Sequence, residues 1–95
     1  DTSCPLSDFV PAEQIANPQA LQLKLTVNGQ VRQDGNTSDM MRTVAELIAA
    51  VSAYFTLEKG DILLTGTPAG VSSICSGDQL EASIEQVGSL VVSVA

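Results

Sequence analysis

The segment Thr65-Gly66-Thr67-Pro68-Ala69-Gly70 holds the residues of this chain that are best suited to bind a small anion. It combines two threonine hydroxyls with two glycines and a proline, directly after the apolar run Ile62-Leu63-Leu64. Glycine lets a ligand approach the backbone because it has no Cβ, and proline fixes φ. Such a loop can offer backbone N–H groups and the Thr67 hydroxyl to a carboxylate. A tight turn between two strands explains the same residues, so the composition leaves both interpretations open.

Other polar side chains are weaker candidates for chemistry. Glu81 and Glu85 fall on one side of a predicted late strand, which suits a pair of metal ligands but is more typical of a solvated row. Arg32 and Gln33 can bind a carboxylate, although residues that follow a hairpin turn are more often exposed. The chain has no histidine, so it cannot by itself form a Ser-His pair, a Cys-His pair or a His-ligated metal site.

Composition and charge limit the classes of partner. The 95 residues make one domain at most, and 44% of them are hydrophobic, which predicts a packed core. The net charge of -7 includes only four basic residues, which are scattered, so neither nucleic acid nor an anionic membrane is an expected partner. No apolar run approaches the roughly 20 residues of a membrane span, and no signal peptide is recognisable. We therefore expect a cytoplasmic protein.

Two further features concern the cysteines and the extent of the chain. Cys4 and Cys75 can pair only if the fold brings them together, and in a chain without secretory features free buried thiols are expected instead. The absence of histidine and a first residue that is Asp rather than Met suggest a portion of a larger protein.

A β-hairpin is the clearest local prediction among the elements that must position these residues. Residues 21–27 alternate between apolar and polar side chains, which is the pattern of a half-buried strand. Asn28-Gly29 follows and tolerates positive φ at both central positions of a type I′ turn. The first strand should therefore pair with a strand at residues 30–33.

One amphipathic helix and three more strands are predicted after the hairpin. Thr43 with Glu46 fits a capping box, and the apolar side chains that follow at helical spacing predict an amphipathic helix from Val44 to Tyr54. Residues 1–20 contain three prolines and predict an extended covering arm, and Asp34-Gly35-Asn36 predicts a turn. Strands are expected at residues 62–64, 79–85 and 90–94. This order of elements predicts a mixed or antiparallel α+β domain.

Four blocks of the sequence resemble the fumarylacetoacetate hydrolase family, in family order. The longest runs from Leu57 to Val71, and its portion Gly60 to Val71 resembles the motif near the family's C-terminus. The others are Ser3-Cys4-Pro5-Leu6 with Phe9-Val10-Pro11, Leu23 to Gly29, and Arg32 to Met40. The similarity is greatest to the acylpyruvate hydrolase branch and covers nearly the whole chain. One departure is Ser72, where many relatives have glycine.

The resemblance implies a mixed β-roll of the fumarylacetoacetate hydrolase type, with residues 1–95 as its C-terminal part only, mostly strands with one amphipathic helix. It implies a homodimeric enzyme that uses magnesium or manganese and acts on small 2-oxo or 2,4-diketo acids, as in the catabolism of aromatic compounds. The family's metal ligands, a Glu-x-Glu pair and an Asp, fall upstream of Asp1. The resemblance thus implies no metal ligand and no catalytic residue within this chain, and it places Thr67, with its neighbour Gly66, against the substrate's carboxylate.

These implications lead to one main hypothesis and two alternatives. The main hypothesis is a divalent-metal-dependent hydrolase that cleaves a carbon–carbon bond in acylpyruvate-type or fumarylpyruvate-type acids. The first alternative is an oxaloacetate tautomerase, a decarboxylase or a related isomerase on the same scaffold. The second is a non-catalytic fragment that needs a partner chain. In every case the chain alone is expected to be inactive, because the missing N-terminal part of the enzyme would hold the catalytic groups.

Overall fold

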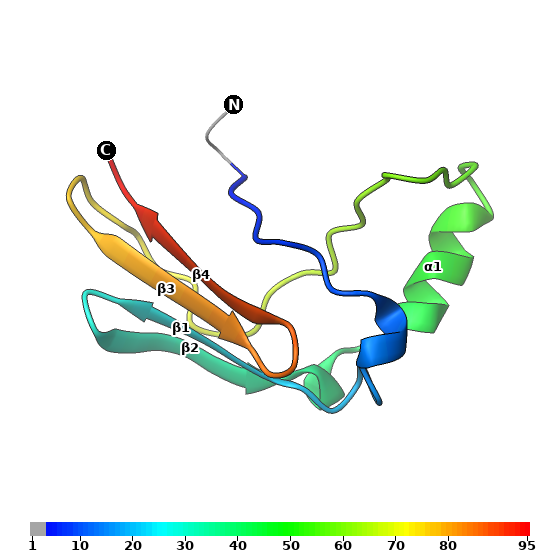
Figure 1. The fold of residues 1–95 in the computed structure, drawn as a ribbon, viewed down its shortest axis with the longest axis horizontal. Helices are drawn as coiled ribbons and strands as arrows, with labels where there is room; N and C mark the ends of the chain where they lie inside the picture. The colour runs from blue at the N-terminus through cyan, green and yellow to red at the C-terminus, as the bar shows by residue number, and fades with distance from the viewer. Residues whose placement is uncertain (1–3) are drawn as a thin grey trace.

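The computed structural model describes residues 4–95, and its main feature is a four-stranded antiparallel sheet (Figure 1). The strand order is β2-β1-β3-β4, so the two hairpins join through β1 and β3. The strands are β1 (Gln22–Val27), β2 (Gln30–Asn36), β3 (Gln79–Ile84) and β4 (Gly88–Ser93). The helical elements are α1 (Val44–Ser52) and two 3₁₀ turns, η1 (Ala12–Gln14) and η2 (Thr37–Asp39). This arrangement confirms the predicted α+β class, mostly strands with one helix.

The β1–β2 hairpin reverses at the predicted turn. Asn28 and Gly29 have φ values of 52° and 83°, the positive values that a type I′ turn requires at both central positions. The turn is followed at once by β2, which pairs antiparallel with β1. The predicted hairpin is therefore confirmed.

β2 continues past the residues at which the sequence predicts a turn. Asp34-Gly35-Asn36 belongs to the strand, so that prediction is wrong. Gly35 pairs with Leu23 in the ladder, and a Cβ on Gly35 would lie 3.2 Å from Pro68 Cβ. The glycine therefore permits close packing against the loop that contains Pro68, and the chain does not reverse there.

The strand predicted at residues 62–64 does not form, and that prediction is wrong. Ile62 and Leu64 are 53% and 78% exposed, and none of the four strands among residues 4–95 pairs with them. A strand needs a neighbour to satisfy its backbone N–H and C=O groups. The later strands do form close to their predicted positions, as β3 and β4.

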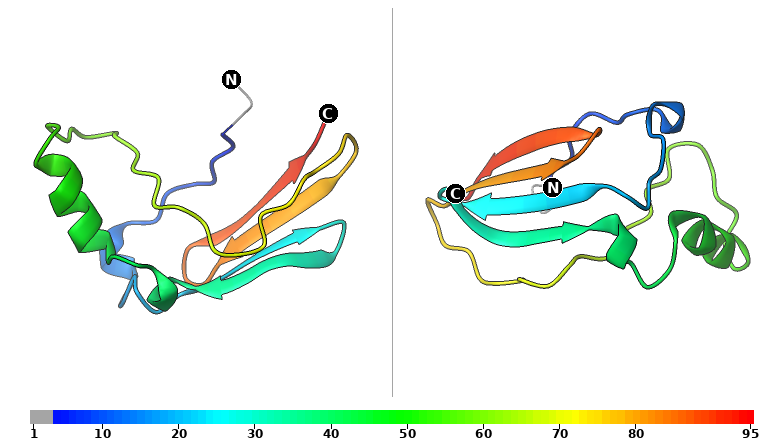
Figure 2. Two further views of the ribbon diagram at one scale, coloured as in Figure 1. Left: turned by 180° about the vertical axis from the view of Figure 1, so that it is seen from behind. Right: turned by 90° about the horizontal axis from the view of Figure 1, so that it is seen from below.

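α1 begins at the predicted capping box. Thr43 Oγ1 accepts from Glu46 N at 3.1 Å, and Thr43 N donates to Glu46 Oε1 at 2.8 Å. Because this backbone donor favours the charged form, it lowers the pKa of the Glu46 carboxyl below its ordinary value. The helix ends at Ser52, shortly before the predicted Tyr54, where Tyr54 N bonds to Val51 O in a tighter turn. α1 lies past the end of the sheet and covers neither of its faces (Figures 1 and 2).

Residues 4–20, the described part of the N-terminal arm, are mostly irregular and contain only the short η1, as the three prolines predict. Asp1 and Ser3, the latter in the first family-like block, lie outside the described residues. None of the helices within residues 4–95 is long and apolar enough to cross a bilayer.

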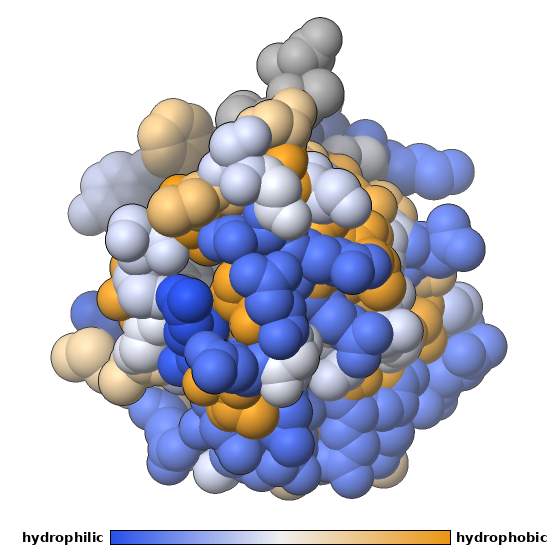
Figure 3. Space-filling model, turned by 90° about the vertical axis from the view of Figure 1, so that its left-hand side faces the viewer, coloured by the Kyte–Doolittle hydropathy of each residue, from blue (hydrophilic) through white to orange (hydrophobic). Residues whose placement is uncertain are grey.

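The sheet has one apolar face and one polar face, because side chains alternate along each strand. The apolar face includes Leu23, Leu25 and Val27 of β1, in register with Ile84, Ala82 and Leu80 of β3. Only Leu21 and Val27 are buried hydrophobic residues among those described. Large apolar side chains remain exposed elsewhere, including Phe9, Met41, Tyr54, Leu64 and Val71. Figure 3 shows apolar residues reaching the surface between hydrophilic ones. The packed core that the composition predicts is therefore not completed by these residues alone.

The exposure of the two cysteines follows from this small core. Cys4 and Cys75 are both free, which confirms the expected thiols. Both are exposed, however, so the prediction that they are buried is wrong. The described residues provide too little interior to cover them.

Candidate functional site

A cleft of about 600 Å³ lies between the Thr65–Pro68 loop and the segment that links β2 to α1. The loop forms one wall, residues between Asn36 and Arg42 form the other, and Leu23, Leu47 and Ile84 complete the lining. Clefts of this volume suit small ligands. The two residues that the family resemblance singles out, Thr67 and Gly66, both line this cleft.

The loop leaves room for a ligand beside its backbone. Gly66 has a φ of 96°, in the left-handed region that favours glycine. A Cβ on Gly66 would meet nothing within 4 Å, so the space beside its backbone is open. Thr67 follows and is exposed. A peptide N–H and a hydroxyl are thus neighbours on a wall that an anion can approach.

β2 anchors the loop through two neighbouring side chains. Gln33 Nε2 donates to Thr67 Oγ1 and to Pro68 O, each at 2.8 Å. Arg32 Nη1 donates to Ser72 Oγ at 2.6 Å, so the serine that departs from the family pattern supplies an acceptor. The expectation that Arg32 and Gln33 are exposed is wrong, because both are half-buried. The donors Arg32 Nη1 and Gln33 Nε2 hold the loop.

A β-bulge allows two consecutive residues of β2 to reach the same loop. Leu25 pairs with Gln33 and Thr26 pairs with Val31, so Arg32 is an extra residue in the ladder. In a regular strand neighbouring side chains point to opposite faces, and a bulge re-aims one of them. No pattern in the sequence predicts this bulge, so the sequence does not predict that Arg32 and Gln33 both contact the loop.

Gly70 brings the loop's backbone directly against β2. Its φ is 106°, and a Cβ on it would overlap the carbonyl oxygen of Arg32. Only glycine tolerates both conditions. The loop therefore packs at a defined position against β2 and forms one wall of the cleft. It is not a tight turn between two strands, because residues 62–64 form no strand.

Gln19 holds the opposite wall. Its Oε1 accepts from Val44 N at 2.7 Å, and its Nε2 donates to Thr37 O at 3.1 Å. Thr37 Oγ1 in turn accepts from Leu21 N at 2.9 Å. One side chain thus joins the N-terminal arm, η2 and the first turn of α1. The sequence predicts no role for Gln19, because a single glutamine before a strand forms no recognisable pattern.

The charged residues of the cleft lining are Asp39 and Arg42. Both are exposed, and Arg42 gives an anionic ligand one cation to approach.

A single carboxylate is a poor centre for a divalent cation, which favours several oxygen ligands. Within residues 4–95, no three Cys, Asp or Glu side chains gather where they could hold a metal ion. These residues therefore do not make a complete site for magnesium or manganese.

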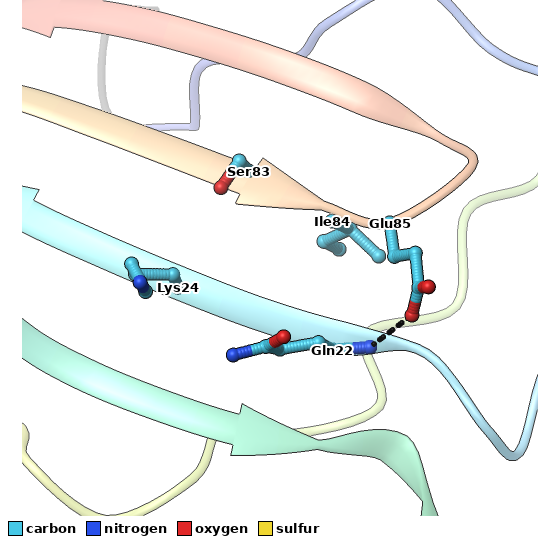
Figure 4. A pocket seen from close by; sticks show the side chains of 5 residues that line it. All are labelled: Gln22, Lys24, Ser83, Ile84 and Glu85. Atoms are coloured by element: carbon cyan, nitrogen blue, oxygen red, sulfur yellow. Dashed lines mark hydrogen bonds between the residues drawn. The ribbon is translucent and has the colours of Figure 1, made fainter.

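A second hollow, of about 280 Å³, lies over the ends of β1 and β3 (Figure 4). Its lining residues are Gln22, Lys24, Ser83, Ile84 and Glu85. Glu85 Oε1 accepts from Gln22 N at 3.1 Å. Glu85 follows the last residue of β3, so it does not continue a strand row with Glu81, although both carboxylates are exposed as expected.

Comparison with known proteins identifies the family of this chain. The family model described as "Fumarylacetoacetate (FAA) hydrolase C-terminal" matches residues 1–95. The chain therefore belongs to the fumarylacetoacetate hydrolase family, a family of enzymes, and the resemblance in its sequence is confirmed.

Two similar curated proteins are oxaloacetate tautomerases. The mitochondrial oxaloacetate tautomerase FAHD1 of Rattus norvegicus is 49% identical over 89 residues, which cover 94% of this chain and 40% of that protein. Oxaloacetate tautomerase YcgM of Escherichia coli is 49% identical over 86 residues, which cover 90% of this chain and 39% of that protein. The chain thus spans about 40% of the length of these relatives.

A solved structure supports the fold. The maleylpyruvate hydrolase of Sphingobium sp. SYK-6, in complex with manganese(II) ion and pyruvate, superposes with a TM-score of 0.89 at 41% identity. The match covers 90% of this chain and 33% of that one. The fumarylacetoacetate hydrolase type of fold is confirmed.

Proposed function

We propose that the whole enzyme containing this chain is an oxaloacetate tautomerase or a closely related isomerase of 2-oxo acids. Both tautomerases are 49% identical to the chain, whereas the Sphingobium maleylpyruvate hydrolase is 41% identical. The comparisons thus favour the tautomerase alternative over the carbon–carbon bond hydrolase that was the main hypothesis from the sequence. Hydrolysis of acylpyruvate-type acids stays the second candidate, supported by the maleylpyruvate hydrolase.

The observation that carries this proposal is the position of Thr67 and Gly66 on the wall of the 600 Å³ cleft. We assign the Gly66 backbone and the Thr67 hydroxyl to one carboxylate of the substrate. A hydroxyl and a backbone amide are suitable partners for a carboxylate, which only accepts hydrogen bonds. Arg42 on the opposite wall adds the positive charge that a dicarboxylate such as oxaloacetate favours.

The chain's own contribution to the reaction is binding and orientation. Tautomerisation moves a proton between a substrate carbon and an oxygen, and this chain has no histidine for general acid–base catalysis. We propose that the acid–base group lies upstream of Asp1. Magnesium or manganese, held mainly there by the Glu-x-Glu pair and the Asp that the resemblance implies, is the proposed cofactor. The manganese(II) ion and pyruvate in the Sphingobium hydrolase structure support this choice.

We propose further that residues 1–95 are the C-terminal part of a catalytic domain whose N-terminal part covers the apolar surface left open here. The chain spans about 40% of its relatives, and exposed side chains such as Leu64 and Val71 need a cover. A homodimer would cover more of this surface.

Assays of the full-length protein separate these candidates. We expect it to accelerate the conversion of enol-oxaloacetate to the keto form, followed by ultraviolet absorbance, with pyruvate release measured in parallel. Pyruvate released from oxaloacetate at the same rate would indicate a decarboxylase. Faster cleavage of an acylpyruvate than tautomerisation of oxaloacetate would restore the hydrolase hypothesis, and the absence of all three activities would favour the non-catalytic alternative.

A further inference from the structure

Gln33 is a half-buried residue of β2 whose amide contacts the candidate site without lining the cleft. It is in register with Leu25 of β1, so its side chain shares the apolar face of the sheet. There its Nε2 lies 2.8 Å from both Thr67 Oγ1 and Pro68 O. These two hydrogen bonds hold the polar side chain of Gln33 in place on the apolar face of the sheet.

The orientation of the Gln33 amide follows from its two partners. A peptide carbonyl has no proton to donate, so Pro68 O only accepts, and the amide must turn its nitrogen toward the loop. The second proton of that nitrogen faces Thr67 Oγ1, so the hydroxyl oxygen is the acceptor. The single hydroxyl proton must then point away from Gln33.

We propose that Gln33 is a positioning residue that keeps the Thr67 hydroxyl as a hydrogen-bond donor to the substrate's carboxylate. This inference rests on the proposed function of the loop. A carboxylate accepts hydrogen bonds and does not donate them. If the Thr67 proton were donated to an internal acceptor, the hydroxyl would present only lone pairs to the substrate. Gln33 prevents this arrangement by donating to the hydroxyl oxygen.

A direct test replaces the donor of Gln33 by an acceptor of the same size. Gln33→Glu turns the contact into a carboxylate, so the Thr67 proton is drawn toward it and away from the cleft. In the full-length enzyme, kcat/KM for oxaloacetate tautomerisation should fall about tenfold to a hundredfold, matching the loss from Thr67→Val. Gln33→Met is the second variant; it keeps the side-chain length without placing a charge near the sheet.

The double mutants distinguish positioning from general support of the loop. If Gln33 acts mainly through the Thr67 hydroxyl, the losses of kcat/KM from Gln33→Glu and Gln33→Met should be much smaller when Thr67 is already valine, because only the contact with Pro68 O is then left to lose. Both should change the same kinetic parameter, KM or kcat, as Thr67→Val changes. Arg32→Met is the matched control, because Arg32 anchors the same loop at Ser72 without contacting Thr67. Its effect should multiply with that of Thr67→Val.

Two results would overturn the inference, and they are distinguishable. Losses from the Gln33 variants that multiply fully with the loss from Thr67→Val would make Gln33 a structural anchor, with the function of Thr67 intact. No loss from Thr67→Val itself would overturn the proposed function of the loop and remove the basis of the inference. Thermal unfolding of each variant, measured in parallel, identifies any loss that is due to misfolding.

Discussion

The side-chain amide of Asn28 donates to Asp78 Oδ1 at 2.9 Å and joins the β1–β2 turn to the residue before β3. Asn28 Oδ1 accepts from Gln79 N at 2.9 Å, and Cys75 N donates to Asp78 Oδ2 at 2.8 Å. These bonds fix β3 beside β1 at the end of the sheet opposite to the cleft. Because β1 and β3 supply Leu23 and Ile84 to the cleft lining, this junction supports the site from a distance.

The junction predicts an acid-sensitive contribution to stability. The Cys75 N–H donor, with the Asn28 amide, holds the pKa of Asp78 below its ordinary value. A lowered pKa in the folded state stabilises the fold above the ordinary pKa of about 3.9, and this stabilisation is lost as the pH falls through the lowered value. Asp78→Asn should therefore lower the urea midpoint of the full-length enzyme at pH 7 and pH 5. The difference from wild type should shrink below pH 3.9. A constant difference at all pH values would contradict this role.

Gly70 predicts a steric effect that can be separated from backbone strain. Gly70→Ala adds a Cβ that overlaps the Arg32 carbonyl oxygen, so the loop must move away from β2. The control Gly60→Ala has a similar φ of 94° but open space around it, and it should cost only the roughly 1–2 kcal/mol of a left-handed residue. In the full-length enzyme, Gly70→Ala should lower the melting temperature further and reduce oxaloacetate turnover. Equal effects of Gly70→Ala and Gly60→Ala on the melting temperature and on turnover would show that the loop is not packed at a fixed position against β2.

The exposed apolar surface predicts the behaviour of residues 1–95 expressed alone. With only Leu21 and Val27 buried among the described hydrophobic residues, the isolated chain should bind a hydrophobic dye strongly and unfold without a cooperative transition. Calorimetric titration with magnesium or manganese should show no stoichiometric site. A sharp thermal transition together with tight metal binding by this chain alone would contradict the need for an upstream part.

Much of the local structure could be predicted because it depends on neighbouring residues. The Asn28-Gly29 turn and the Thr43–Glu46 capping box both involve residues within three positions of each other, and both are present. Predictions failed where the partner is distant or absent. Gly35 resembles a turn residue in the sequence, but its role is to accommodate Pro68.

In the candidate site, too, local features could be predicted from the sequence and contacts with distant residues could not. The loop around Thr67 could be located from its hydroxyl, glycine and proline residues and from the family resemblance. The side chains that hold the two walls, Gln33 and Gln19, could not, because their partners lie more than 15 positions away in the sequence. A single glutamine forms no spacing pattern that would predict such a contact. No sequence pattern predicts the bulge at Arg32 either.

The central claim is that Thr67 binds the substrate of a 2-oxo acid enzyme, and the kinetics of Thr67→Val beside Thr65→Val test it most directly. Both changes keep the shape of the side chain and remove one hydroxyl from the cleft wall. A hydrogen bond to a charged group contributes roughly 1.5–3 kcal/mol, which corresponds to about a tenfold to hundredfold change in rate. On oxaloacetate with the full-length enzyme, we predict a loss of this size in kcat/KM for Thr67→Val and a small effect for Thr65→Val. Equal small effects would contradict the claim and leave the loop as a structural turn, and a large effect confined to Thr65→Val would assign the contact to the other hydroxyl.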